Sequence, residues 1–148
     1  MSRLSLERSR ALIRQIGAII LGRTPKVHRI PFGPLKGRYI FISFDISPRM
    51  FFGIDEPWIA KLARTYVKQN DIIYDIGAHI GYTTVLFAHY LSNSGQIHAF
   101  EILRSTTDLL KETVQANPFR NVIIHTIGLG AHEQTLELPI GNTRMTSV

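Results

Sequence analysis

The stretch Asp75-Ile76-Gly77-Ala78-His79-Ile80-Gly81 decides the fold, because it joins a predicted buried strand, which begins at Ile72, to a predicted helix over Tyr82–Leu91. Both glycines suit such a turn. At Gly77 a side chain would keep a ligand away from the backbone, and at Gly81 it would hinder close contact between helix and strand. Open α/β sheets bind ligands at the carboxyl ends of their strands. The stretch therefore predicts a ligand-binding loop.

Strand and helix patterns alternate downstream of this loop. The expected segments are a strand at Gln96–Glu101, a helix from Ser105 to Ala116, and strands at Asn121–Ile127 and Thr135–Ile140. Ser105 and Asp108 have the spacing of a capping box at the start of that helix. The order β-α-β-α-β is typical of a parallel sheet. We predict an α/β, Rossmann-like sheet that is truncated after its first β-α-β-α-β half.

The 148 residues divide into three predicted regions. These are an amphipathic helix over residues 1–24, a β-rich cap with a hairpin around Gly33–Gly37 over residues 25–54, and the α/β domain over residues 55–148. Asp55 is expected to cap the first helix of that domain, with a proline in its first turn. Trp58, near the start of the same helix, is expected to anchor the cap.

Two carboxylates flank the predicted ligand crevice. Asp75 precedes the first glycine, and Glu101 ends the second strand, where an acid can accept hydrogen bonds from both hydroxyls of a ribose. The spacing Gly77-x-x-x-Gly81 differs from the G-x-G-x-x-G of nicotinamide-cofactor sites, and Asp75 would repel a pyrophosphate. S-adenosylmethionine, which carries a ribose, a sulfonium and an ammonium, suits the two acids better. The structural alternative is that Asp75 caps the loop and Glu101 is a solvated strand end.

Four motifs follow one another between Gly53 and Ile140. They are Gly53-Ile54-Asp55-Glu56, Asp75-Ile76-Gly77-Ala78-His79-Ile80-Gly81, Phe100-Glu101-Ile102 and Asn117-Pro118-Phe119-Arg120-Asn121-Val122. Together they resemble the motifs of the FkbM-type family of S-adenosylmethionine-dependent methyltransferases. In that family Asn usually stands at the position of His79, and Pro at the position of Ile102.

The resemblance implies a methyltransferase that transfers the cofactor's methyl group to a hydroxyl oxygen of a small molecule or glycan. The residues that would line the site of S-adenosylmethionine are Asp75, Gly77, Ala78, His79, Gly81, Glu101, Ile102 and Glu56. No catalytic base can be named from these residues. The other histidines lack the spacing of metal ligands, so we expect no metal site.

Charge is distributed unevenly along the chain. The net charge is +6, but residues 1–49 carry ten Lys/Arg and two acids, whereas residues 50–148 carry seven Lys/Arg and nine acids. The second part has no basic face for a phosphate backbone, so we expect no nucleic-acid partner. The basic helix over residues 1–22 is expected either to pack on its own domain or to contact an anionic membrane peripherally. With no cysteine, no signal peptide and no spanning apolar run, a cytoplasmic location is expected.

Two other functions stay open from the sequence. One is a truncated, non-catalytic module that binds the cofactor or docks to another chain, and the other is a nicotinamide-dependent enzyme. The first strand of a half sheet would lack a neighbour, and such an apolar edge favours pairing or self-association. By the family resemblance, the half of the sheet that is missing here would hold most of the substrate pocket, so we expect this chain alone to transfer no methyl group.

Overall fold

The structure is a computed structural model that describes residues 12, 15–17, 19, 25–42, 48–91 and 94–132. Its elements, in chain order, are β1 (Lys26–Arg29), β2 (Tyr39–Ile42), α2 (Pro48–Phe51), α3 (Pro57–Tyr66), β3 (Ile72–Ile76), α4 (Tyr82–Tyr90), β4 (Gln96–Phe100), α5 (Arg104–Gln115) and β5 (Val122–His125). Leu12, residues 15–17 and Ile19 are helical. The rest of the helix predicted over residues 1–24 lies outside the described residues, as does the strand predicted at Thr135–Ile140.

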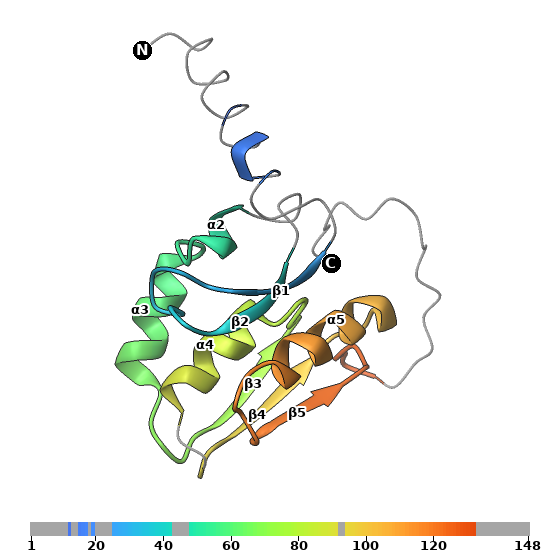
Figure 1. Cartoon of the computed structure of the whole chain (residues 1–148). Coiled ribbons are helices and arrows are strands. Elements are labelled where there is room, and N and C mark those ends of the chain that lie inside the picture. The colour runs from blue at the N-terminus through green and yellow to red at the C-terminus, as the bar shows by residue number, and fades with distance from the viewer. Residues whose placement is uncertain are drawn as a thin grey trace, which may run out of the picture.

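The predicted parallel sheet is confirmed. Its strands lie in the order β3-β4-β5, with Asp75 opposite Ala99 and Phe100 opposite His125. The two connecting helices, α4 and α5, pack on the same face of the sheet (Figure 1). Ala78, Ala99 and Leu110 form a buried cluster between that face and α5. The arrangement is the first β-α-β-α-β half of a Rossmann-like fold.

The hairpin predicted around Gly33–Gly37 is also confirmed. β1 and β2 are antiparallel, and the hairpin lies on the side of the helices away from the sheet (Figure 1). The Thr113 hydroxyl accepts a hydrogen bond from the Phe41 N–H at 2.9 Å. The Asn117 side chain accepts from the Tyr39 N–H at 3.0 Å and donates to the Tyr39 carbonyl at 2.7 Å. Side chains of α5 and of the turn after it thus hold the hairpin on the helix layer.

The largest buried cluster joins the hairpin to the helices. It contains Ile30, Leu35 and Ile40 from the hairpin, Ala60 and Ala63 from α3, and Ile80, Tyr82, Val85 and Leu86 from the glycine loop and α4. Burying an aliphatic side chain of this size stabilises a fold by about 1.5–3 kcal/mol. The hairpin therefore helps to fix the position of α4, and with it the loop that precedes α4.

Both predicted helix caps are wrong in detail. The N-cap of α3 is Glu56, in the left-handed conformation and without a side-chain cap bond, rather than Asp55. α5 begins after Leu103, so Ser105 lies inside the helix and forms no capping box, while Asp108 pairs with Lys111 at 2.8 Å. The short helix α2 lay in a stretch rich in turn-forming residues and was not predicted.

Candidate functional site

The site is built from two loops that follow neighbouring parallel strands. The loop at 77–81 follows β3, and the turn at 101–103 follows β4. The N–H groups of Gly77 and Ala78 both donate to the carbonyl of Phe100, each at 2.9 Å. These two bonds extend the pairing of β3 with β4 past the last strand residue, so the two loops start side by side.

Asp75 lies inside this junction and is only 7% exposed. The hydroxyl of Thr84 donates to its Oδ2 at 2.5 Å, and that of Thr83 donates to both carboxylate oxygens at 3.0 Å. Burial raises the pKa of Asp75, and the hydroxyls of Thr84 and Thr83 partly offset that rise. Both threonines belong to the first turn of α4, so Asp75 fastens the end of β3 to the start of this helix.

The two glycines of the loop have different surroundings. Both have positive φ, 79° at Gly77 and 94° at Gly81. A Cβ at Gly77 would meet nothing within 4 Å, whereas one at Gly81 would lie 2.7 Å from Leu110 Cδ1 and 3.1 Å from Thr113 Cγ2. Gly81 therefore permits close packing of the loop on α5. The sequence had predicted that this glycine permits close contact between a helix and a strand. Gly77 borders open space, as a backbone that receives a ligand requires.

Glu101 connects the two loops. It is 7% exposed, and its Oε2 accepts from the His79 N–H at 3.1 Å while its Oε1 accepts from the Leu103 N–H at 2.9 Å. Each carboxylate oxygen can accept two hydrogen bonds, and one acceptor position on each oxygen is taken by these amides. The described contacts therefore leave one further acceptor position on each oxygen for a ligand.

His79 is one of two described residues other than glycine with positive φ, at 50°. Asn, Asp and His are enriched in this conformation, which explains how His can stand where the related motif has Asn. The side chain is half-buried, and its pKa is lowered by that burial, with partial compensation from the charge of Glu101. The imidazole is accordingly neutral at pH 7.

Glu56 is the other residue with positive φ, at 40°, and its side chain is exposed. Its neighbourhood is fixed by Tyr82, whose hydroxyl donates to the Asp55 carbonyl at 2.9 Å. Burial, with the charges of Asp55 and Glu56, raises the pKa of Tyr82 to about 12. Because Tyr82 is the first residue of α4, the start of α3 lies near the glycine loop.

Ile102 stands directly after Glu101 and is partly exposed. Its side chain covers Gly128, where a Cβ would lie 2.7 Å from Ile102 Cδ1. The turn after β4 and the segment after β5 therefore lie against each other at Ile102.

The structure thus brings the predicted residues of both loops together, with Ala78 buried beneath them. Sequence reasoning missed Thr83, Thr84 and Tyr82, which hold Asp75 and the start of α3 in place. The available signal was a pair of hydroxyl residues in the first turn of a helix that follows an acid at a strand end. Among the described residues there is no group of three or more His, Asp or Glu that could hold a metal ion. In the same part of the chain, no helix combines the length and apolar character needed to span a bilayer.

The described fold is similar to solved structures of two archaeal proteins. TYW2 from P. horikoshii in complex with MeSAdo is 19% identical, with a TM-score of 0.56 over 85% of this chain and 50% of that chain. TYW2 from M. jannaschii in complex with AdoMet is 22% identical, with a TM-score of 0.53 over 69% of this chain and 42% of that chain. No protein-family model and no curated protein matches the chain. The chain spans half or less of these solved proteins, and it shares part of their Rossmann-like fold.

Proposed function

We propose that the chain binds S-adenosylmethionine as part of a methyltransferase, with the ribose on Glu101 and the rest of the cofactor along the glycine loop. The observation that carries this proposal is the Glu101 carboxylate at the end of β4, with one acceptor position left on each oxygen. Two hydroxyls on adjacent ribose carbons match two acceptors on one carboxylate. The solved relatives in complex with AdoMet and MeSAdo support the choice of ligand class.

The surroundings fit such a ligand. Gly77 leaves space beside the loop backbone. The partly exposed Ile102 offers an apolar surface for the adenine of the cofactor, next to the carboxylate proposed for the ribose. A neutral His79 adds no positive charge beside a sulfonium and an ammonium. The exposed Glu56 at the start of α3 would add negative charge at the same end of the sheet.

Asp75 is proposed as a positioning residue. Its oxygens already accept bonds from two threonine hydroxyls, and the side chain is buried, so it acts on the cofactor through the shape of the loop. When bound, S-adenosylmethionine supplies an electrophilic methyl carbon, and the protein supplies position and electrostatics. The residues assigned here hold the cofactor, and none of them is assigned as a base.

The acceptor is proposed to be a hydroxyl of a small molecule or glycan, on the FkbM-type resemblance of Gly53-Ile54-Asp55-Glu56 and the three motifs that follow it. A cytoplasmic location and a peripheral membrane contact through residues 1–22 are part of the same proposal. They are tested by sedimentation with anionic vesicles at low and high salt, against a chain that begins at Thr24. Equal sedimentation of the two chains would contradict the membrane contact.

Calorimetry with two ligands tests the role of Glu101. S-adenosylhomocysteine and its 2′-deoxy analogue are titrated into the natural chain and into Glu101→Ala. We expect Glu101→Ala to weaken S-adenosylhomocysteine by roughly 10- to 150-fold, because a hydrogen bond to a charged acceptor contributes about 1.5–3 kcal/mol. The deoxy analogue should bind the natural chain more weakly than S-adenosylhomocysteine does, and the variant should discriminate less between the two ligands.

The control is Glu112→Ala, which removes an exposed acid from α5 and should leave both affinities unchanged. An undiminished preference for the ribose in Glu101→Ala would separate Glu101 from the ribose. Displacement of S-adenosylhomocysteine by NADH at similar concentration would instead favour the nicotinamide alternative. Transfer of labelled methyl to a hydroxylated acceptor by this chain, above the level of Glu101→Ala, would contradict both the non-catalytic module and the expected inactivity of the half sheet.

A further inference from the structure

The hairpin carries positive charge and no negative charge. Residues 25–42 contain no Asp or Glu. Their basic residues are Lys26, Arg29, Lys36 and Arg38. The ion pairs that the described residues form lie elsewhere, one between α2 and the start of α3 and one within α5. In the described part of the chain, no carboxylate therefore pairs with a cation of the hairpin.

The turn of the hairpin brings three of these cations together at Gly37. The Gly37 N–H donates to the Ile30 carbonyl, and the Ile30 N–H donates to the Arg38 carbonyl, each at 2.8 Å. A Cβ at Gly37 would lie 3.5 Å from Arg29 Nη2, so the Arg29 guanidinium lies beside the residue that separates Lys36 from Arg38. The side chains of Arg29 and Lys36 are exposed. The cluster is thus fixed by the hairpin backbone and accessible from solvent.

Arg38 is the half-buried member of the cluster. Its Nε and Nη2 donate to His89 Nδ1 at 3.2 and 3.1 Å, and its guanidinium carbon lies 5.2 Å from the centre of the Phe119 ring. These contacts join the hairpin to α4, whereas Trp58, which the sequence predicts as an anchor of the cap, is 64% exposed. A guanidinium has five N–H donors, so the described contacts leave three of them without an acceptor.

His89 does not compensate the charge of Arg38. A guanidinium only donates, so Nδ1 of His89 is the acceptor and its ring proton is on Nε2. Burial and the charge of Arg38 lower the pKa of His89, and the imidazole is therefore neutral at pH 7. The C-terminal end of α4, where His89 lies, supplies a negative charge of only about one half. A half-buried cation with so little compensation is unfavourable and attracts an anion.

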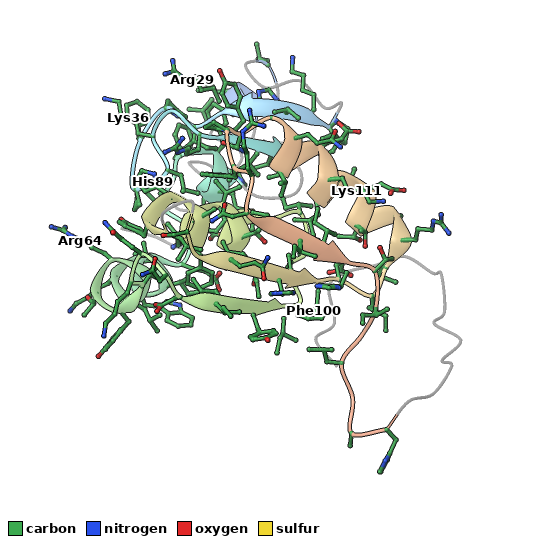
Figure 2. All side chains as sticks on the ribbon, turned by 90° about the horizontal axis from the view of Figure 1, so that it is seen from below. Arg29, Lys36, Arg64, His89, Phe100 and Lys111 are labelled. Atoms are coloured by element: carbon green, nitrogen blue, oxygen red, sulfur yellow. The ribbon has the colours of Figure 1, made fainter. Side chains whose placement is uncertain are left out.

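The cluster lies away from the proposed cofactor site. His89 follows Tyr82 by seven residues of α4, which corresponds to about 10 Å along the helix axis. Figure 2 shows Arg29, Lys36 and His89 toward one side of the molecule, and Phe100, at the end of its strand, toward the other. An anion on the cluster is therefore not a part of the S-adenosylmethionine bound at the strand ends.

We propose that Arg29, Lys36 and Arg38 form a binding site for a phosphate monoester, with His89 as the residue that positions the Arg38 guanidinium. A phosphate monoester carries about −1.5 to −2 charges at pH 7 and three acceptor oxygens. The planar N–H fork of arginine matches the geometry of such a group. A phosphodiester has a single charge and fewer free oxygens, so three cations match it less well. Soluble phosphate esters and the headgroup of phosphatidic acid share the required chemistry.

A nuclear magnetic resonance titration with glycerol 3-phosphate tests the site without any cofactor. The Arg38 Nε–H and the Gly37 N–H of the full chain are followed, and we expect saturable shifts of both signals. Arg38→Gln should weaken binding by at least about tenfold, because it removes hydrogen bonds between charged groups. Arg29→Gln and Lys36→Gln should each weaken it by about 1.5- to 5-fold, as for exposed charge pairs. These two exposed substitutions keep the test valid if Arg38→Gln disturbs the hairpin.

Lys26→Gln is the matched control. It removes an exposed cation from the same hairpin, but Lys26 pairs with Ile42, about 10 Å along the strand from Arg29. At 0.15 M salt this distance exceeds the screening length, so the affinity should stay unchanged. Dimethyl phosphate, a monoanion, should bind more weakly than glycerol 3-phosphate. The absence of saturable shifts, or an equal loss of affinity in Lys26→Gln and Lys36→Gln, would overturn the proposal.

Vesicles distinguish the two sources of the phosphate. Phosphatidylcholine vesicles contain equal fractions of either phosphatidic acid or phosphatidylglycerol, whose phosphate is a diester. Preference for phosphatidic acid that is lost in Arg38→Gln assigns the lipid headgroup, and binding of glycerol 3-phosphate without this preference assigns a soluble ester. Displacement of glycerol 3-phosphate by a lower concentration of an RNA oligonucleotide without terminal phosphates would overturn the proposal. A failure of S-adenosylhomocysteine to bind would leave these results unaffected.

Discussion

The loop after β3 and the turn after β4 both begin next to an acid at the end of a parallel strand, yet they use that acid differently. Asp75 is surrounded by the hydroxyls of Thr83 and Thr84, and its acceptor positions are largely taken within the protein. Glu101 accepts one amide bond on each oxygen and keeps acceptor capacity at the outer end of its strand. Asp75 thus stabilises the start of the loop, whereas Glu101 keeps acceptor positions that a ligand could use.

The difference follows from the position of each acid relative to the strand end. Asp75 is the fourth of the five residues of β3, on the face covered by α4, so its side chain points at the first turn of that helix. Glu101 comes directly after the last residue of β4, and its carboxylate accepts from backbone N–H groups of the two loops and not from hydroxyls of a helix. A shift of one or two residues at a strand end therefore separates a carboxylate that is bonded within the protein from the carboxylate that we propose for the ligand.

The largest expected change in stability comes from a substitution at Gly81, in the loop that Asp75 fastens to α4. We expect Gly81→Ala to lower the free energy of unfolding by roughly 3 kcal/mol, from about 1–2 for the left-handed backbone and about 1–3 for overpacking, less a small gain from a stiffer unfolded chain. Leu110 Cδ1, at 2.7 Å from the new methyl, belongs to a fully buried side chain and has little room to move. Urea denaturation of the natural and variant chains measures the difference.

Gly77→Ala is the matched variant, since its φ of 79° gives a similar backbone cost but its Cβ meets no atom within 4 Å. It should be about 1–3 kcal/mol more stable than Gly81→Ala, the difference being the overpacking alone. Equal stabilities for the two variants would mean that the α5 contact at Gly81 relaxes freely.

Asp75 makes the stability of the fold depend on pH. Because the fold raises its pKa above 3.8, the unfolded chain releases this proton at lower pH than the folded chain does. Stability from this group is therefore fully present below pH 3.8 and falls as pH rises through the raised pKa. Asp75→Asn keeps an oxygen for the Thr84 hydroxyl and removes the titration, so its stability relative to the natural chain should increase with pH and then level off.

Asp108→Asn is a control of opposite sign. Lys111 lowers the pKa of Asp108 through a hydrogen bond and its charge, so the stability from Asp108 is present at neutral pH and lost on acidification. Urea titrations between pH 3 and 7 should show the two variants diverging from the natural chain in opposite directions. Parallel curves would remove burial as the cause of the Asp75 shift.

The parallel sheet and the site loop were predictable because both depend on local pattern. β4 matches its predicted bounds apart from its last residue, and α4 differs by one residue at its end, since a short apolar run and a glycine-bounded helix are read from neighbouring residues. Asn117 shows where such reasoning ends. It stops a helix, as predicted, but its amide also bonds both backbone groups of Tyr39, a contact between residues 78 positions apart. Nothing in the local sequence specifies that partner.

The smallest expected effect belongs to His79→Asn. Both residues tolerate the left-handed conformation, and the bond to Glu101 comes from the backbone N–H, which the substitution keeps. We therefore expect a change of less than about 0.5 kcal/mol in unfolding free energy at pH 8, as for substitutions that disturb no buried contact. Urea denaturation at pH 8 measures this difference.

Acidification should change the stability of the natural chain relative to that of His79→Asn. Burial lowers the pKa of His79 below 6.5 in the fold, so the unfolded chain takes up this proton first, and the natural chain loses stability as pH falls through 6.5 toward the lowered pKa. Asn does not titrate, so His79→Asn should become the more stable of the two by pH 5. A stability difference that stays constant from pH 8 to pH 5 would place the imidazole in water, and His79 would then belong to the surface of the loop and not to the wall of the site.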